Sequence, residues 1–352
     1  MQYFKKIDGL RFIAISLVLL EHFAKILGNS IFAGFYGVDL FFCISGFLIT
    51  TILIKPNKNS FKHNYRNFIG RRIIRIFPIY YLTIGLLCLF QPRIVQGYLP
   101  YLLTYTFNYA VIIHGIPSFA IWHLWSLSVE EQFYLLWPFI TITLKNKLDI
   151  LFGIVLLIIV VSYSQLCFNM IPSISAYNYY SLLSRMGSLG LGALGVIAYR
   201  KELLPQKLFK STIFEYFMLL FLCVTLISSF SLKMFFLGIC SIYFILKAAY
   251  FNFSINSINR FLTNRFIVYI GTISYGIYIY HLPIDYFFSK YLLDPFWKSI
   301  PFTSLGFFGK IRWNIWIIKF PLYTAISIFV AFCSFKYIEK PILGLKEKYF
   351  KN

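Results

Sequence analysis

Residues 148–167 read LDILFGIVLLIIVVSYSQLC, an apolar run whose single charged side chain is Asp149. An α-helix needs about 20 predominantly apolar residues to cross the hydrocarbon core of a bilayer. The run shows no alternation of apolar and polar residues at a period of two, which the strands of a membrane β-barrel would require. It therefore predicts a transmembrane helix.

Composition extends this prediction to the whole chain. Of 352 residues, 59% are hydrophobic and 13% are charged, whereas about 25% of the residues in a soluble domain are charged. We predict an all-α fold, a polytopic integral membrane helical bundle. Its ten predicted spans lie near residues 8–27, 36–54, 73–91, 121–144, 148–167, 181–199, 212–230, 233–249, 266–288 and 314–335.

One further apolar segment, residues 94–118, is interrupted by Pro100 and Pro117. It fits an interfacial helix, a re-entrant helix or an eleventh span. An eleventh span would invert the orientation of every element that follows it.

The basic residues indicate how the chain is oriented. A net charge of +21 can indicate nucleic-acid binding, but these residues lie in short loops between apolar runs. With ten spans and a cytoplasmic N-terminus, 23 of the 33 Lys and Arg residues fall on the cytoplasmic side, nine fall on the other side, and Arg11 lies within the first span. This asymmetry follows the positive-inside rule. We expect both termini in the cytoplasm, a multi-pass location in the inner (cytoplasmic) membrane, contact with membrane lipids, and no nucleic-acid partner.

The chain shows no internal repeat and no appended soluble domain. We predict one membrane domain at residues 1–345 and a cytoplasmic tail at 346–352. The first residues resemble a signal peptide, but charged residues interrupt the apolar run and no clear cleavage site follows, so we expect a retained first helix. The six cysteines show no metal-ligand spacing. We expect them to be small core residues and expect no metal site.

Two ionisable residues of the first span, Arg11 and His22, are separated by about three helical turns. They therefore share one helix face, roughly 16 Å apart along the axis. Ionisable residues at membrane depth usually mark functional sites, and this face can line a path across much of the membrane. Alternatively, Arg11 extends to the cytoplasmic headgroups and His22 caps the outer interface.

Segment 122–134, WHLWSLSVEEQFY, is rich in polar groups for a predicted span. Its adjacent carboxylates, Glu130 and Glu131, point to different sides of a helix. One can face the protein interior, and the other a pore or a basic partner. Alternatively, one forms a structural ion pair with another helix, for example through Arg185.

Further polar residues fall in the outer half of the predicted bundle. Asp39 begins the second span, and Tyr278 and His281 lie near the outer end of the ninth. A neutral imidazole can accept a hydroxyl proton near neutral pH, and a carboxylate can orient the ring.

The sequence RRIIR places Arg71, Arg72 and Arg75 at the predicted inner side. Helical spacing brings at least two of these guanidiniums together, which suits bidentate recognition of phosphate. Alternatively, they are ordinary positive-inside charges that contact anionic lipids.

Six segments taken together resemble the acyltransferase 3 family of membrane O-acyltransferases. They are KIDGLRFIAISLVLLEH (6–22), GVDLFFCISGFLIT (37–50), RRIIRIFPIYYL (71–82), WSLSVEEQFYLLWP (125–138), ISYGIYIYHLP (273–283) and YIEKP (337–341). The resemblance implies a ten-helix domain that carries an acyl group, usually acetyl from acetyl-CoA, across the membrane to a hydroxyl of an extracytoplasmic glycan. This chain departs from the family pattern at Phe12, where glycine is usual, and the change concerns packing more than chemistry.

The resemblance also implies roles for single residues: His22 in acyl transfer, and the three arginines at the CoA phosphates. We predict a catalytic set of His22, Glu130 and Asp39, a set binding acetyl-CoA of Arg11, Arg71, Arg72 and Arg75, and a substrate-binding set of Trp125, Ser128, Tyr278 and His281.

The predicted acceptor is a surface glycan or lipid-linked oligosaccharide, such as an O-antigen or capsule. Because many relatives append a hydrolase-like domain, we expect this chain to act alone or with a separate extracytoplasmic partner. The alternative function is a transporter or flippase, which inverted repeats and broken helix pairs would favour. Neither is clear in the sequence.

Overall fold

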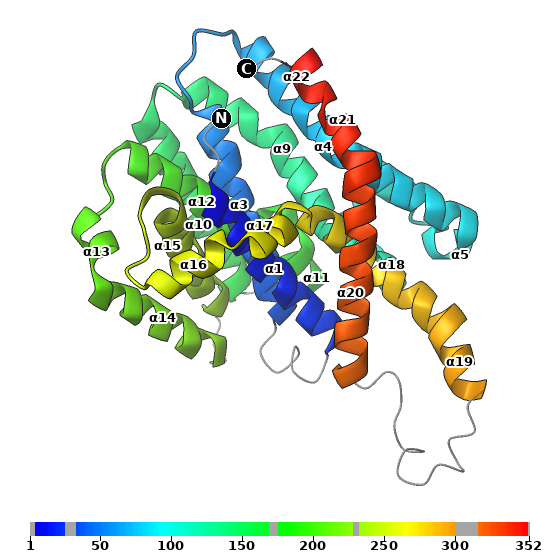
Figure 1. The fold of residues 1–352 in the computed structure, drawn as a ribbon. Helices are drawn as coiled ribbons and strands as arrows, with labels where there is room; N and C mark the ends of the chain where they lie inside the picture. Colours follow the sequence, from blue (N-terminus) through cyan, green and yellow to red (C-terminus); the bar gives the residue numbers. More distant parts are fainter. Residues whose placement is uncertain (1–3, 25–32, 169–174, 228–231, 300–315, 351–352) are drawn as a thin grey trace.

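The computed structural model describes residues 4–24, 33–168, 175–227, 232–299 and 316–350. Throughout these ranges the chain forms helices and no strand (Figure 1). The all-α prediction is confirmed. The ends of the predicted spans 8–27 and 212–230, and the first residues of 314–335, lie outside the described ranges.

The long helices each overlap one predicted span. They are α1 (Lys5–Phe23), α3 (Ala33–Leu53), α4 (Phe61–Phe90), α9 (Leu124–Leu144), α10 (Leu148–Phe168), α12 (Leu182–Arg200), α14 (Thr212–Ile227), α15 (Lys233–Tyr250), α18 (Ser274–Phe288) and α20 (Trp316–Ser334). Short helices connect them: α5 (Pro92–Val95), α6 (Leu99–Leu103), α7 (Phe107–His114), α8 (Phe119–Trp122), α11 (Ser175–Tyr180), α13 (Gln206–Lys210), α16 (Asn256–Thr263), α17 (Arg265–Thr272), α19 (Asp294–Ser299), α21 (Lys340–Leu343) and α22 (Leu345–Tyr349). The π-helical turns η2 (Ser289–Leu293) and η5 (Phe335–Glu339) continue α18 and α20.

Six helical stretches of the described chain are long and apolar enough to cross a membrane. They are Ala33–Leu53, Phe61–Phe90, Leu148–Leu166, Tyr177–Arg200, Lys233–Tyr250 and Trp316–Leu343. A seventh span is possible if α17 and the helix that follows it, bent by 67° between them, are one span. The chain is therefore a multi-pass membrane protein by helix length and composition. Helices α1 and α9 fall outside this set because both carry several polar side chains, and these two helices contribute to the site described below.

The segment at residues 94–118 does not form a continuous spanning helix. It is divided among α5, α6 and α7, which have 4, 5 and 8 residues. The backbone breaks at Gly97, Tyr105 and Gly115, where φ is positive.

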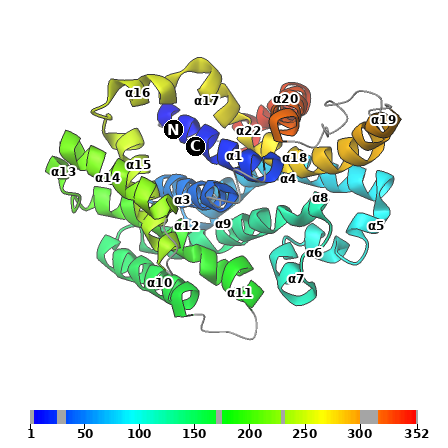
Figure 2. The same cartoon turned by 90° about the horizontal axis from the view of Figure 1, so that it is seen from below.

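Helix α3 lies in the middle of the bundle, in contact with α1, α9, α12 and α15 (Figure 2). Two glycines allow this close approach. A Cβ atom at Gly37 would overlap the backbone oxygen of Ala14 on α1, and one at Gly46 would overlap that of Leu189 on α12. Phe12, which replaces the usual glycine of α1, packs edge-to-face against Phe261 with ring centroids 6.0 Å apart.

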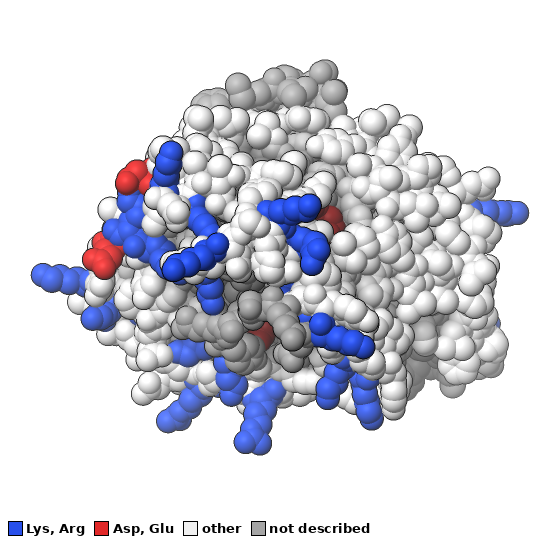
Figure 3. Space-filling model, turned by 90° about the horizontal axis from the view of Figure 1, so that it is seen from above, with Lys and Arg blue, Asp and Glu red and all other residues white. Residues whose placement is uncertain are grey.

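Lys and Arg side chains gather on the face shown in Figure 3, with few Asp and Glu side chains among them. This face lies at the end of the molecule where α4 begins and where α22 lies (Figure 1). Residues 346–350, assigned from the sequence to a tail, lie in and just after α22 and pack on α4; residues 351–352 lie outside the described ranges. Lys247, a basic residue near the end of the predicted span 233–249, is buried in an ion pair with Glu215 at 2.7 Å.

Candidate active site

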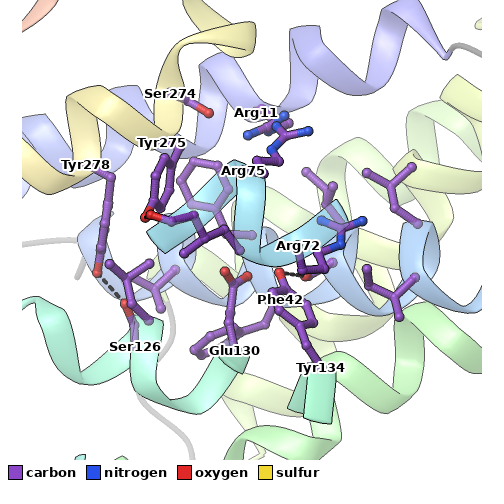
Figure 4. A pocket seen from close by; sticks show the side chains of 18 residues that line it. Arg11, Phe42, Arg72, Arg75, Ser126, Glu130, Tyr134, Ser274, Tyr275 and Tyr278 are labelled. Atoms are coloured by element: carbon purple, nitrogen blue, oxygen red, sulfur yellow. Dashed lines mark hydrogen bonds between the residues drawn. The ribbon is translucent and has the colours of Figure 1, made fainter. Parts of the chain in front are cut away.

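Side chains from α1, α3, α4, α9 and α18 enclose a cavity of about 150 Å³ inside the bundle, here called the central cavity (Figure 4). Its polar lining converges from different helices on one space. The polar residues are Arg11, Ser45, Arg72, Arg75, Ser126, Glu130, Tyr134, Ser274, Tyr275 and Tyr278. Apolar side chains of α3 form much of the remaining wall.

The arginines of the central cavity interact with neighbouring carboxylates and aromatic rings. Arg11 lies 3.5 Å from Asp8, one turn earlier on α1, and also close enough to Glu130 for their charges to interact. Arg72 lies over the Tyr134 ring, with its guanidinium carbon 5.2 Å from the ring centroid. Figure 4 shows the Glu130 side chain entering the cavity from α9 while the arginines enter from α1 and α4.

A second cavity of about 390 Å³, here called the cationic cavity, adjoins the first and shares Arg72 and Arg75 with it. It lies between the end of α3, the start of α4 and α22. Five cations of the described residues line it: Lys55, Arg71, Arg72, Arg75 and Lys346. Among the side chains that the structure describes, no Asp or Glu lines it. Concentrated positive charge without a neutralising carboxylate favours an anionic ligand, and guanidiniums suit phosphate in particular.

At the other end of the central cavity, Tyr278 leads to a cluster of histidines. Its hydroxyl lies 2.6 Å from that of Ser126 and donates to the backbone carbonyl of His123 at 3.1 Å. The rings of His123 and His281 are 4.9 Å apart, and those of His281 and His22 are 5.0 Å apart. The two cavities therefore adjoin each other through Arg72 and Arg75, and the histidine cluster adjoins the central cavity through Tyr278.

Hydrogen bonding fixes the proton positions in this cluster. His281 Nδ1 lies 2.6 Å from the backbone oxygen of Tyr278, which can only accept, so Nδ1 carries the proton. In a neutral ring, Nε2 of His281 is then an acceptor, and it lies 2.9 Å from Nδ1 of His22. His22 must donate from Nδ1, which leaves the basic lone pair of its neutral ring on Nε2.

His123 has a similar arrangement. Its Nε2 donates to the backbone oxygen of Ile279 at 3.1 Å, so its lone pair lies on Nδ1, a buried atom with no hydrogen-bond partner among the described residues. Within those residues, no group of three or more His, Cys, Asp and Glu side chains is arranged to hold a metal ion.

Most of the predicted site residues lie in the lining of the two cavities or in the histidine cluster beside them. Arg11, Arg72, Arg75, Glu130 and Tyr278 line the central cavity, and His22 and His281 form the histidine pair. Arg71 lines the cationic cavity only, and its Nε donates to the backbone oxygen of Phe350 at 3.0 Å.

Three predicted residues lie elsewhere. Asp39 faces α12, where its Oδ1 atom accepts from Arg185 and Ser188, both at 3.2 Å. Arg185 therefore pairs with Asp39 and not with a glutamate of α9. Trp125 packs against Tyr179 and Tyr180, and Ser128 is buried against its own helix. None of the three lines the central cavity.

Four residues at or beside the central cavity were not predicted as site residues: His123, Ser126, Tyr134 and Ser45. The hydroxyls of Ser45 and Tyr134 lie 2.6 Å apart in the cavity wall. A helical period could have indicated two of these residues, since Ser126, Glu130 and Tyr134 are spaced by four and share a helix face. Ser45 has no comparable signal.

Fold and site together define a polytopic membrane protein with buried Arg, Glu and His side chains gathered inside its helical bundle. A family model described as an acyltransferase domain matches residues 4–336. The chain belongs to this family, the acyltransferase 3 family that its motifs resemble.

Three curated relatives align over nearly the whole chain. It is 30% identical to "Putative peptidoglycan O-acetyltransferase YrhL" of Bacillus subtilis, over 97% of this chain and 55% of that protein. It is 28% identical to peptidoglycan O-acetyltransferase OatA of Listeria monocytogenes, over 97% of this chain and 56% of that protein. It is 26% identical to O-acetyltransferase OatA of Staphylococcus aureus, over 99% of this chain and 58% of that protein. The chain thus spans about half the length of these relatives. No solved structure matches it.

Proposed function

We propose that this chain is a membrane O-acetyltransferase that moves an acetyl group from cytoplasmic acetyl-CoA to a hydroxyl of a cell-envelope glycan. The observation that carries the proposal is the hydrogen-bonded pair of His22 and His281, which leaves a basic nitrogen on His22. This pair contacts Tyr278, which lines the central cavity, and the central cavity adjoins the cationic cavity.

The cationic cavity supports acetyl-CoA as the donor. Arg71, Arg72 and Arg75 offer planar donors for the phosphates of CoA. The narrower central cavity, with its apolar wall from α3 and its hydroxyl groups, suits the pantetheine arm, which is uncharged and partly polar. Residues of the two cavities thus match the two chemically different ends of one donor.

In the proposed reaction, Nε2 of His22 accepts the proton of the acceptor hydroxyl. The hydroxyl oxygen attacks the acetyl carbonyl carbon, the carbon–sulfur bond of the thioester breaks, and the leaving thiolate takes up the proton held by His22. A positioned base contributes roughly 10²–10⁴-fold to such a step. A second route, in which His22 briefly carries the acetyl group, is distinguished by trapping acetyl-histidine after mixing with donor alone.

For the acceptor, the names of the relatives favour peptidoglycan over the O-antigen, capsule or lipid-linked oligosaccharide expected from the sequence. We therefore propose a hydroxyl of peptidoglycan as the first acceptor to test. An extracytoplasmic partner is part of this proposal, and reconstitution of the purified chain with and without an envelope extract tests the need for it.

The proposed topology has ten spans with both ends in the cytoplasm. It is supported by a long helix at each predicted position and by the Lys and Arg gathered on the face in Figure 3, which we assign to the cytoplasmic side. The cationic cavity would then open toward the compartment that contains CoA.

The decisive experiment measures acetyl transfer in proteoliposomes. Purified protein is given radiolabelled acetyl-CoA on one side and peptidoglycan fragments on the other, and the products are examined by mass spectrometry. Gain of one acetyl group by the glycan, dependent on both substrates, supports the proposal. Passage of an unmodified glycan without consumption of acetyl-CoA would instead indicate a transporter or flippase, which the relatives do not favour.

A further inference from the structure

Residues 340–350 bring one side chain, Lys346, to the cationic cavity. Helices α21 and α22 pack against α4, and Lys346 of α22 lines the cavity together with the three arginines of α4. No motif of the sequence analysis includes Lys346.

The position of this segment is fixed by the same turns of α4 that supply the arginines. Nε of Arg71 donates to the backbone oxygen of Phe350 at 3.0 Å. The Phe350 ring lies against Gly70, where a Cβ atom would overlap the ring carbons. Both the backbone and the side chain of Phe350 therefore contact α4. These contacts anchor α22, whose Lys346 side chain lines the cavity.

Lys346 stands in an unfavourable electrostatic position when the cavity holds no anion. Burial and the charges of Arg75, Arg72 and Arg71 lower its pKa to about 7. A further cation, Lys55, lines the same cavity, and no carboxylate among the described side chains does. Like charges gathered in a partly buried space are stabilised by a ligand that carries several negative charges.

We propose that Lys346 binds a phosphate group of CoA, so that segment 340–350 completes the phosphate site begun by Arg71, Arg72 and Arg75. This inference rests on the proposed donor and adds a residue to its binding site. The shared chemistry, a phosphate ester, is also present in anionic lipid headgroups, and the experiment separates these two sources.

The test compares Lys346→Met, Lys346→Arg and the control Lys348→Met, whose parent side chain is exposed on the same helix. Binding of CoA, of pantetheine and of inorganic pyrophosphate is measured by calorimetry on full-length protein in nanodiscs of neutral lipid. Because charge-assisted hydrogen bonds are strong, Lys346→Met should weaken CoA and pyrophosphate binding about tenfold and leave pantetheine binding unchanged. Below pH 7, where the amine of Lys346 is protonated, Lys346→Arg and Lys348→Met should bind CoA as the parent protein does.

Equal CoA affinity in Lys346→Met and the parent protein would overturn the inference, as would an equal loss for pantetheine. If the parent protein binds pyrophosphate through Lys346 but does not bind CoA, the phosphate site stands and the proposed donor is wrong. Repeating the titration in phosphatidylglycerol nanodiscs identifies the source: competition that depends on Lys346 would assign the site to lipid and overturn the CoA assignment.

Discussion

The Nδ1 atom of His22 lies 2.9 Å from the Nε2 atom of His281, and His281 is itself held by the backbone oxygen of Tyr278. This chain of two hydrogen bonds joins α1 to α18 and orients the His22 ring. In the proposed mechanism the two histidines therefore have different roles: His22 presents a basic atom, and His281 positions it.

His22→Gln should therefore abolish transfer, because an amide neither takes up a proton near pH 7 nor forms a reactive acyl adduct. We expect a loss of at least roughly 10²–10⁴-fold in the rate of acetyl transfer, with membrane insertion and CoA affinity unchanged. Transfer is measured in proteoliposomes, and His114→Gln, at an exposed histidine of α7, is the matched control. Glycan acetylation near the parent level in His22→Gln would refute the mechanism.

His281→Gln should be less damaging, since the Gln side chain can still accept a hydrogen bond from His22. We expect a loss of about tenfold, roughly the value of one hydrogen bond. His281→Leu, which cannot accept, should lose more than His281→Gln. If the two variants are equally active, His281 does not orient His22.

The arginines should separate into two groups. Arg72→Ala and Arg75→Ala should weaken CoA binding, because both side chains border the two cavities. Lys should restore affinity only in part, since an ammonium lacks the two-donor plane of a guanidinium. Arg71→Ala should in addition release segment 340–350, whose backbone it holds. Calorimetry measures the first effect, and limited proteolysis after residue 340 measures the second.

Asp39 and Arg185 should behave as a structural pair. Both are buried, and removal of one partner from such a pair costs about 3–5 kcal/mol. Asp39→Asn should therefore lower thermal stability strongly, and the double variant Asp39→Asn/Arg185→Met should recover much of it. Transfer activity is measured on the double variant. If that variant is stable but inactive, Asp39 has the predicted catalytic role. If it is stable and active, Asp39 serves only as the structural partner of Arg185.

The fold was predictable because long apolar runs have few alternatives to membrane helices. The residues at which the helices begin and end were less predictable. Helix α4 begins at Phe61, twelve residues before the predicted span at 73–91, because Ser60 caps a polar helical extension by accepting from the backbone N–H of His63. Hydropathy marks where a helix can enter lipid and does not mark where it begins.

The site was predictable in part. Glu130 was predicted as a site residue because placing a carboxylate within an apolar helix costs free energy, and it lines the central cavity. Asp39 was predicted as well, but it pairs with Arg185. Local sequence does not tell which face of a helix meets a cavity and which meets another helix. The contact between His22 and His281 depends on two helices far apart in the chain, so no spacing rule could predict it.

Topology can be tested with single cysteines at exposed lysine and glutamate positions. Lys58→Cys and Glu202→Cys should react with an impermeant maleimide only from the cytoplasmic side, and Lys290→Cys only from the outside. Each is exposed in the structure. The exposed native Cys223 is replaced by Ala in the background. If Lys290→Cys reacts from the same side as Lys58→Cys, the number of spans between them is even and the ten-span topology is wrong.

Donor binding should depend on pH. Burial and the charges of Arg75, Arg72 and Arg71 lower the pKa of Lys346 to about 7, and the phosphates of a bound donor would raise it. The protonated amine is thus fully available to bind phosphate below pH 7. Its contribution is lost as the pH rises toward the pKa of the bound state. CoA affinity should fall between pH 7 and 9, by at most about tenfold per pH unit because one proton is linked to binding.

The other groups around Lys346 decide how this result is read. A phosphate stays charged through this range, since its second pKa is about 6. Glu339 lies near Arg75 and Lys55 lines the same cavity, so Lys55→Met serves as a control that should keep the pH dependence. Lys346→Arg should bind CoA with an affinity independent of pH from 7 to 9, because a guanidinium does not lose its proton there. A pH profile that Lys346→Arg leaves unchanged would show that another group titrates, and Lys346 would then have no part in binding the donor.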